Sequence, residues 1–439
     1  MKSNFPIALL GGHVRQISLR NKGESGVEVF SVTNSEGFTR STDFFSKEVF
    51  SKDVSNYKVV RKGQFAYNPS RINVGSIDYL RIAGKGLVSP LYIVFETDSE
   101  LYPDYLFRYM KSDWGNTQIR SNTEGAVRDS LKFKGLESIK IPLPPLDDQK
   151  RIAHLLGKVE GLIARRKQHL QQLDDLLKSV FLEMFGDPVR NEKGWETGTS
   201  SIYADMVTVG VVVKPASYYV EHGVIALRSL NIKPNRIDLN DLVYFSQVAS
   251  DGPLSKSRLK SGDVVIVRTG KTGTAAVVPN HLEGVNCIDL IIIRPKQNTV
   301  NPQYLSFLIN SDRGVALIAS REVGGIQKHF NIGALNKIPF LLPPIELQNQ
   351  FAAIVEKVES IKSRYQQSLA ELETLYGALS QKAFKGELDL SRVPLPADDA
   401  EIIRNEPLKT AKTTYLNEQN RGFDSERQQL LMVAESSEN

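Results

Sequence analysis

The chain has 439 residues, of which 41% are hydrophobic and 24% charged, so it can bury the cores of two or three domains and is neither disordered nor fibrous in composition. A net charge of +5 is mild for this length, so charge alone favours an ordinary soluble protein, although local basic surfaces are compatible with it. The single cysteine, Cys287, excludes an intrachain disulfide and a cysteine-rich zinc site.

The first segment, residues 1–145, carries short runs of β-branched and aromatic residues between Gly, Asn and Ser. These runs predict strands, at 27–32, 57–60, 64–67 and 91–95. A helix is expected over 103–111, because Pro103 suits a first helical turn, where its missing N–H is not needed. The segment therefore predicts a first globular head of α/β (α+β) type.

After Leu143-Pro144-Pro145 the pattern becomes helical over residues 146–190. Apolar residues recur in alternating steps of three and four, at Ile152, Leu155, Val159, Leu162, Leu170, Leu173, Leu177, Val180 and Met184. Asp147 and Asp148 suit the positive end of a helix dipole, and Gly186 suits a helix end. This spacing predicts a long coiled-coil helix.

Residues 191–344 show the same pattern of short β-branched and aromatic runs as residues 1–145. Strands are expected at 225–228, 264–268 and 290–294, and a helix at 302–310. Residues 345–388 then repeat the helical pattern, with Glu346 near the start, Gly386 near the end, and apolar positions Phe351, Ile354, Val358, Ile361, Leu369, Leu372, Leu379 and Ala383. The remaining residues, 389–439, form a polar tail that we expect to be partly disordered, with short helices near 398–404 and 425–433.

The chain repeats itself at an offset of 199 residues, the difference between Pro145 and Pro344. The matching residues are Pro103, Tyr105 and Leu106 with Pro302, Tyr304 and Leu305; Ser112 and Gly115 with Ser311 and Gly314; Gln149 with Gln348; and Lys158 to Glu160 with Lys357 to Glu359. Before Gly63 the spacing differs. So long a period indicates two copies of a head-plus-helix unit, with pseudo-two-fold symmetry.

Each predicted helix is about 57 Å long at 1.5 Å per residue, and neither can bury its apolar stripe alone. The simplest solution pairs the two helices with each other, antiparallel, which would hold two heads at a fixed separation. The alternative is that each helix packs on its own head.

The motifs resemble a family. Residues 30–34 (FSVTN), 57–60 (YKVV) and 63–71 (GQFAYNPSR) look like a target recognition domain of a type I restriction–modification specificity subunit. Residues 139–145 (IKIPLPP) with 149–153 (QKRIA), and their copy at 338–344, look like the start of that family's spacer helix. The helix ends at 185–188 and 384–388 also match. The resemblance covers about residues 1–390, and the tail departs from it.

The resemblance implies a non-catalytic DNA-reading subunit. Each head would read one half of a split, asymmetric double-stranded DNA site, and the helices would set the gap. Two methyltransferase subunits would dock on the chain, and two ATP-driven restriction subunits would join them. No cofactor is expected in this chain, because S-adenosylmethionine, ATP and magnesium would belong to those partners.

The catalytic motifs that could contradict this interpretation are incomplete. Asn68-Pro69-Ser70 lacks the second proline and the aromatic residue of an adenine-methyltransferase loop. Gly270-Lys271-Thr272 resembles the end of a phosphate loop, but Val265 stands where the earlier glycine is needed. The six histidines show no ligand spacing, and Asp98, Glu100 and Asp104 are better explained as a solvated loop than as a nuclease site.

Two pairs of loops concentrate the side chains that read DNA. Each head has one loop directly after a strand and one before its Leu-Pro-Pro. The candidates are Tyr67, Asn68, Ser70, Arg71, Asn73, Arg120, Arg128 and Lys132 in the first head, and Arg268, Thr269, Lys271, Thr272, Arg321, Gln327 and Lys328, with His329, in the second. Solvated turns are the alternative. If the assignment holds, replacing Arg71 or Arg268 weakens one half-site only.

Two other functions stay open at this stage. The chain could be an enzyme, a nuclease or methyltransferase fused to its own reader, which would be active without partners. It could also be a coiled-coil assembly scaffold whose heads do not bind DNA. A scaffold would show no salt-sensitive DNA affinity, whereas phosphate contacts demand one. We also expect a cytoplasmic protein, because no signal peptide and no apolar run of roughly 18 residues is visible.

Overall fold

The computed structural model describes residues 3–24, 26–34, 36–41, 53–82, 84–124, 130–321 and 330–396. Their contacts form two units: unit 1 holds the described residues of 1–167 and 367–396, and unit 2 holds those of 168–366. The two short helices expected in the tail lie outside the described residues. None of the described helices has the length and apolar content that a membrane crossing requires.

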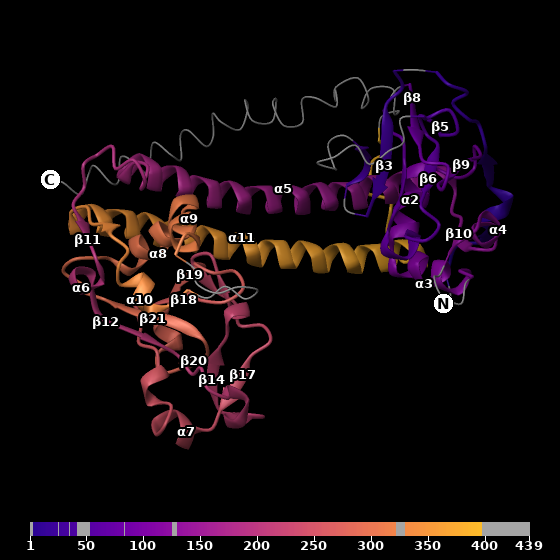
Figure 1. Ribbon diagram of the computed structural model, residues 1–439. Coiled ribbons are helices and arrows are strands. Elements are labelled where there is room, and N and C mark those ends of the chain that lie inside the picture. The colour runs from indigo at the N-terminus through magenta and orange to yellow at the C-terminus, as the bar shows by residue number, and fades with distance from the viewer. Residues whose placement is uncertain are drawn as a thin grey trace. The chain divides into compact units, whose positions relative to one another are not determined.

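The head of unit 1 is built on two four-stranded sheets (Figure 1). One sheet has the order β2-β9-β6-β7 and is antiparallel throughout; the other has the order β4-β3-β8-β5, with β3 and β8 parallel. The strands are β1 (Ile7–Leu9), β2 (Val14–Ile17), β3 (Val29–Thr33), β4 (Gly37–Arg40), β5 (Lys58–Arg61), β6 (Phe65–Tyr67), β7 (Ile77–Tyr79), β8 (Lys85–Val88), β9 (Ile93–Thr97) and β10 (Lys140–Pro142). The helices are η1 (Leu10–Gly12), η2 (Ile72–Val74), α2 (Pro103–Lys111), α3 (Asp113–Ser121) and α4 (Phe133–Glu137).

The head of unit 2 repeats this plan. Its sheet β12-β21-β18-β19 is antiparallel like its counterpart, and its sheet β13-β17-β14-β20 again contains one parallel pair, β14 with β20. The strands are β11 (Thr197–Gly198), β12 (Ala204–Val209), β13 (Tyr219–Val220), β14 (Val224–Leu227), β15 (Ile232–Lys233), β16 (Arg236–Ile237), β17 (Val243–Phe245), β18 (Val264–Val267), β19 (Ala275–Val277), β20 (Asn286–Cys287), β21 (Leu290–Pro295) and β22 (Phe340–Leu341). The helices are α6 (Ser200–Tyr203), η3 (Pro215–Tyr218), η4 (Ser229–Asn231), α7 (Gln247–Asp251), η5 (Ser255–Ser257), η6 (Asn280–Leu282), α8 (Pro302–Asn310), α9 (Asp312–Ala319) and α10 (Ile332–Leu335).

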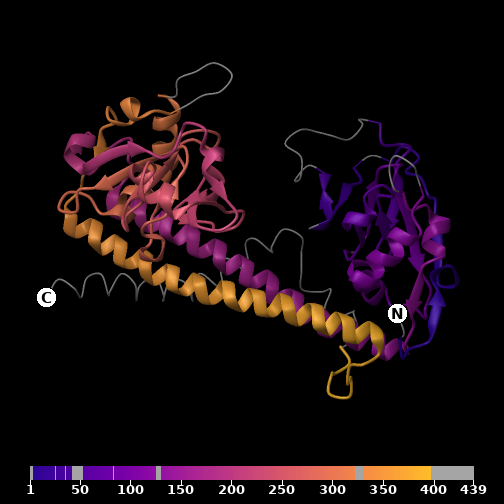
Figure 2. The ribbon, with the colours of Figure 1, turned by 90° about the horizontal axis from the view of Figure 1, so that it is seen from below.

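The two long helices are α5 (Leu146–Phe185) and α11 (Ile345–Lys385), and they pair with each other inside both units (Figures 1 and 2). In unit 1, Lys167 Nζ lies 2.8 Å from a Glu373 carboxylate oxygen. In unit 2, Lys362 Nζ lies 2.7 Å from Asp174 Oδ1. Residues later in α5 therefore meet residues earlier in α11, so the pairing is antiparallel and the expected fold is confirmed.

The last turns of each helix pack on the head of the other repeat. Phe185, at the end of α5, packs against Tyr304 and Phe351 of unit 2, with ring centroids 4.6 and 5.5 Å apart. Phe384, 199 residues later at the end of α11, packs against Tyr105 and Tyr109 of unit 1 at 5.5 and 5.3 Å. The core of each head thus includes the end of the long helix from the other repeat. The alternative, in which each helix packs only on its own head, does not fit these contacts.

A buried glutamine at the start of each long helix fixes that helix to its own head. Gln149 accepts a hydrogen bond from the Tyr102 N–H and donates to two backbone carbonyls, of Glu100 and Pro144, at 2.8 to 2.9 Å. Gln348 makes the same three bonds 199 residues later, to Asn301, Thr299 and Pro343. Both side chains are fully buried. We call this arrangement the glutamine clasp.

Candidate nucleic-acid interface

The first candidate loop in unit 1 follows β6 and presents one free cation. The Asn68 side chain accepts a hydrogen bond from the Ser70 N–H at 3.1 Å, which shapes the turn. Arg71 is exposed, forms no ion pair with any described carboxylate, and immediately precedes η2. Asn73 is half-buried inside η2, and Gly75 ends it at φ 96°, a conformation that favours glycine. Ser70 and Arg71 are therefore the most accessible of the predicted residues here.

Tyr67 does not belong to this surface, which corrects the sequence expectation. Its side chain is fully buried, and its hydroxyl donates to the Leu131 carbonyl at 3.1 Å. Burial raises the pKa of the Tyr67 phenol well above its usual range, so the group stays neutral. Tyr67 has a structural role instead, because its hydroxyl links the end of β6 to the Leu131 backbone in the second candidate loop.

The second loop of unit 1 lies directly against the first. The Leu131 N–H donates to the Pro69 carbonyl at 3.0 Å, so the chain on either side of Leu131 runs beside the Asn68 turn. Lys132 is exposed and pairs with Glu124 at 3.1 Å, and Arg120 is exposed on α3. Arg128 lies outside the described residues.

Unit 2 brings its two loops together through the same hydrogen bond. The Phe330 N–H donates to the Arg268 carbonyl at 3.0 Å, and both residues lie 199 positions after Leu131 and Pro69. Lys271 is exposed, Thr272 and Arg321 are half-buried, and Gly270 and Gly273 have φ of 91° and 84°. Gln327, Lys328 and His329 lie outside the described residues.

Arg268 is already engaged with a partner that the sequence did not reveal. Its guanidinium lies 3.0 Å from Asp289 Oδ1, and the Thr269 hydroxyl donates to Asp289 Oδ2 at 3.1 Å. The Arg268 side chain is only 19% exposed. Asp289, at φ 50°, therefore holds Arg268 and Thr269 in place, and Lys271 is the freely presented cation of this loop. Nothing in the sequence near Asp289 marks it as that partner.

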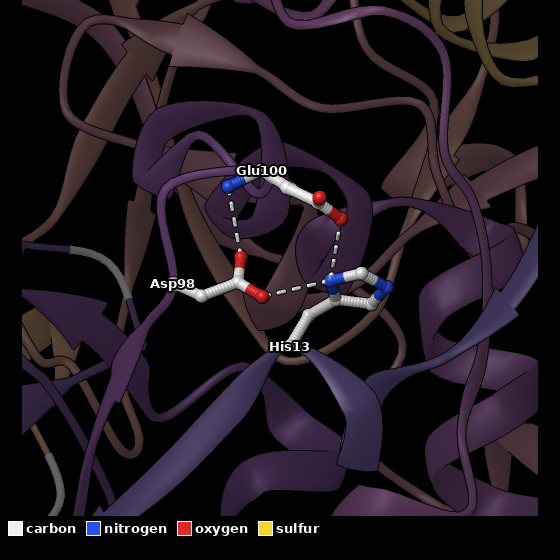
Figure 3. A group of neighbouring side chains, drawn as sticks. All are labelled: His13, Asp98 and Glu100. Carbon is white, nitrogen blue, oxygen red and sulfur yellow. Dashed lines mark hydrogen bonds and ion pairs between the residues drawn. The ribbon is translucent and has the colours of Figure 1, made fainter.

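A cluster outside these loops joins His13, Asp98 and Glu100 (Figure 3). His13 Nδ1 lies 3.0 Å from Asp98 Oδ2 and 3.7 Å from Glu100 Oε2, and the Glu100 N–H donates to Asp98 Oδ1 at 2.9 Å. The second repeat has Gln297 and Thr299 at the positions of the two carboxylates. These bonds tie the turn after η1 to the loop after β9. Asp104, expected in the same acidic loop, pairs instead with Arg108 at 3.1 Å.

Comparison with known proteins gives a consistent family. A family model described as "Type I restriction modification DNA specificity domain" matches residues 26–174 and 251–374. The chain is 23% identical over 319 residues to the type I restriction enzyme EcoKI specificity subunit of Escherichia coli (strain K12), covering 67% of this chain and 68% of that protein. It is 24% identical over 301 residues to the EcoBI specificity subunit of Escherichia coli, covering 62% and 63%.

Two solved structures share the fold. One is a chain from "Structural basis underlying complex assembly and conformational transition of the type I R-M system", with a TM-score of 0.54 at 18% identity over 88% of this chain and 100% of that one. The other is a type I restriction–modification system S subunit from M. genitalium, with a TM-score of 0.54 at 11% identity over 87% and 96%. At these identities the likeness concerns the fold alone.

Proposed function

Since the chain belongs to the type I restriction–modification DNA specificity family, we propose that it is the reading subunit of such a complex, with each head contacting one half of a two-part double-stranded DNA site. In this proposal the chain catalyses nothing. Two methyltransferase subunits dock on it and two restriction subunits join them, and these partners bring S-adenosylmethionine, ATP and magnesium.

The observation that carries the proposal is the repeated joining of two loops in each head. One backbone hydrogen bond, from Leu131 to Pro69 and from Phe330 to Arg268, brings the paired loops together at the same place in both repeats. Each joined pair presents an exposed cation, Arg71 or Lys271, at a strand end. Cations beside polar side chains suit phosphates and base edges. Because the loop sequences differ, the two half-sites should differ as well.

Methylation mapping tests this function directly. We expect DNA from cells that express the chain with its neighbouring methyltransferase subunit to carry methylated adenines in a gapped two-part motif, and the motif to vanish when the gene is removed. If methylation is unchanged although the complex assembles, the chain does not guide methylation and the assembly-scaffold function takes precedence.

Replacing Arg71 with alanine should weaken only the half-site read by unit 1. Loss of one contact to a base or phosphate costs about 1 to 3 kcal/mol, or roughly 5- to 150-fold in affinity. Affinity for duplexes mutated in one half-site at a time measures the effect. Lys271→Ala should weaken only the half-site read by unit 2. Arg190→Ala is the matched control, since it removes a 73% exposed arginine outside both loops. Equal weakening of both half-sites by Arg71→Ala would show a general charge effect instead.

Lengthening both helices should lengthen the gap in the methylated motif. Seven residues inserted after Lys167 and seven after Gln366 preserve the heptad pattern and add about 10.5 Å of helix. At about 3.4 Å per base pair this corresponds to roughly three more base pairs, with both half-sites unchanged. Inserting the seven residues into one helix alone should abolish the motif, because the helices lose their register. A gap that stays constant with both insertions contradicts a spacing role for the helices.

A further inference from the structure

Unit 1 contains a cationic cavity that the DNA-reading loops do not use. Its volume is about 670 Å³, and it lies between the head and the first part of α5. Its lining contains one carboxylate, Asp104, and six cationic side chains. The cations are Lys62, Arg81, Arg108, Lys150, Lys158 and Arg165. Below we call it the cationic cavity.

Most of this positive charge is not neutralised by the described residues. Arg81 pairs with Asp78, and Arg108 pairs with Asp104 and Glu160. The other four cations form no ion pair with any carboxylate in the part of the chain that the structure describes; they are Lys62, Lys150, Lys158 and Arg165. Like charges gathered around a cavity repel one another, so an anionic occupant would be stabilised there.

Small residues of α5 form one wall of the cavity. Ala153, Gly157 and Gly161 lie on one face of α5 at steps of four residues and line the cavity. A side chain at Gly157 would clash with Arg108, because an ideal Cβ there would lie 2.8 Å from Arg108 Nη2. The absence of a side chain at Gly157 therefore lets the Arg108 guanidinium lie against the α5 backbone, on the wall of the cavity.

The second repeat has no equivalent of this charge. At the offset of 199, the residues that replace Arg108, Lys150, His154 and Gly157 are Phe307, Asn349, Ala353 and Glu356. Only Lys158 and Arg165 keep a cation, as Lys357 and Arg364. Two identical subunits docked on the two repeats would use equivalent surfaces. The cationic cavity therefore suits an occupant that is present once.

The described part of the chain reaches the cavity at Pro396, and an anionic segment follows Pro396 in the sequence. Pro396 lines the cavity, and the preceding turn is held on α5 by the Arg151 side chain, which donates to the Val393 carbonyl at 3.1 Å. The next ten residues, 397–406 (ADDAEIIRNE), carry four carboxylates and one arginine, a net charge of −3. A tether of a few residues gives an effective concentration in the millimolar range, so the segment needs an intrinsic dissociation constant of only about a millimolar to occupy the cavity.

From the place of Pro396, the charge of the cavity and its absence from the second repeat, we propose that the acidic segment 397–406 is the anion that binds in the cationic cavity of the same chain. The contact competes with any other anion for those cations. It does not depend on the DNA-reading role, because it is measured on the chain without DNA or partners.

Thiol labelling of the full chain tests the proposal. The native Cys287 is fully buried, and burial raises the pKa of its thiol, so a cysteine introduced at the surface is the reactive one. Lys158→Cys places the probe in the cavity, and Lys357→Cys is the matched control at the equivalent exposed position of unit 2. In the Lys158→Cys chain we expect labelling to become roughly five- to tenfold faster when Asp398→Asn, Asp399→Asn and Glu401→Gln are added together, or in 1 M salt.

A truncated chain and the control position separate binding of the acidic segment from a general effect on labelling. Truncation after Pro396 should accelerate labelling of Lys158→Cys as much as the neutralising changes do, and none of these changes should alter labelling of Lys357→Cys. Equal rates at position 158 with the acidic and the neutralised tail would overturn the proposal. So would protection that appears only after duplex DNA or a partner subunit is added, which would assign the cavity to that partner.

Discussion

Replacing Phe185 with alanine is expected to destabilise unit 2 by about 3 to 5 kcal/mol, the usual cost of removing a buried phenylalanine ring. Phe185 is 1% exposed and contacts Tyr304, Phe351 and Phe181, so the cavity left behind is lined by rigid rings that cannot easily close it. This loss is a large share of a typical unfolding free energy of 5 to 15 kcal/mol.

The chain has two tryptophans, which allow the two units to be followed separately. Trp114 lies in unit 1, and Trp195 lies in unit 2, where its indole N–H donates to the Phe185 carbonyl at 2.8 Å. With Trp114→Phe as background, the Trp195 signal in a denaturant titration should show an earlier transition for Phe185→Ala. Leu182→Ala, at a 52% exposed position of the same helix, should change it little. An unchanged midpoint for Phe185→Ala would mean that the end of α5 does not stabilise unit 2.

Breaking a glutamine clasp is the second large expected effect. Gln348→Leu keeps a similar volume but leaves the Asn301 N–H and the Thr299 and Pro343 carbonyls without their partner. A buried polar group left unpaired costs about 1 to 3 kcal/mol, so we expect a total of about 3 kcal/mol after partial rehydration.

The same change in the other repeat provides an internal comparison. Gln348→Leu should lower the stability reported by Trp195, and Gln149→Leu should lower the stability reported by Trp114, because each clasp lies in a different unit. Gln171→Leu, at an exposed position of α5, serves as the control. If both substitutions shift both reporters together, the two units unfold as one cooperative block.

The architecture was readable from the sequence because its signals are local. Pro103 and Pro302 mark helices that begin at those residues and run to Lys111 and Asn310, as predicted. The two proline-free periodic stretches are α5 and α11 in the structure, and the internal repeat predicted the second head. Period and proline placement depend only on neighbouring residues, so no tertiary information was needed.

The candidate site was less predictable because its details depend on distant partners. The alternation around Tyr67 does not say which face of β6 is buried, and the structure places the ring in the core. The ion pair of Arg268 with Asp289 joins residues 21 positions apart, and no pattern links them. The cationic cavity likewise draws on Lys62, Arg165 and Pro396, which only the folded chain brings together.

The exchange of helix ends also bears on how the chain is made. The core of unit 1 includes Ala383 and Phe384, and the Asn4 N–H near the start of the chain donates to the Lys385 carbonyl at 2.8 Å. Ribosomes add roughly 5 to 20 residues per second, so more than 200 residues separate Lys167 from Phe384 by about 10 to 40 seconds of translation. The described residues of unit 2, which lie within 168–366, are all synthesised before Phe384. Part of the apolar core of the first head therefore stays open to solvent or chaperones until the end of α11 has been synthesised.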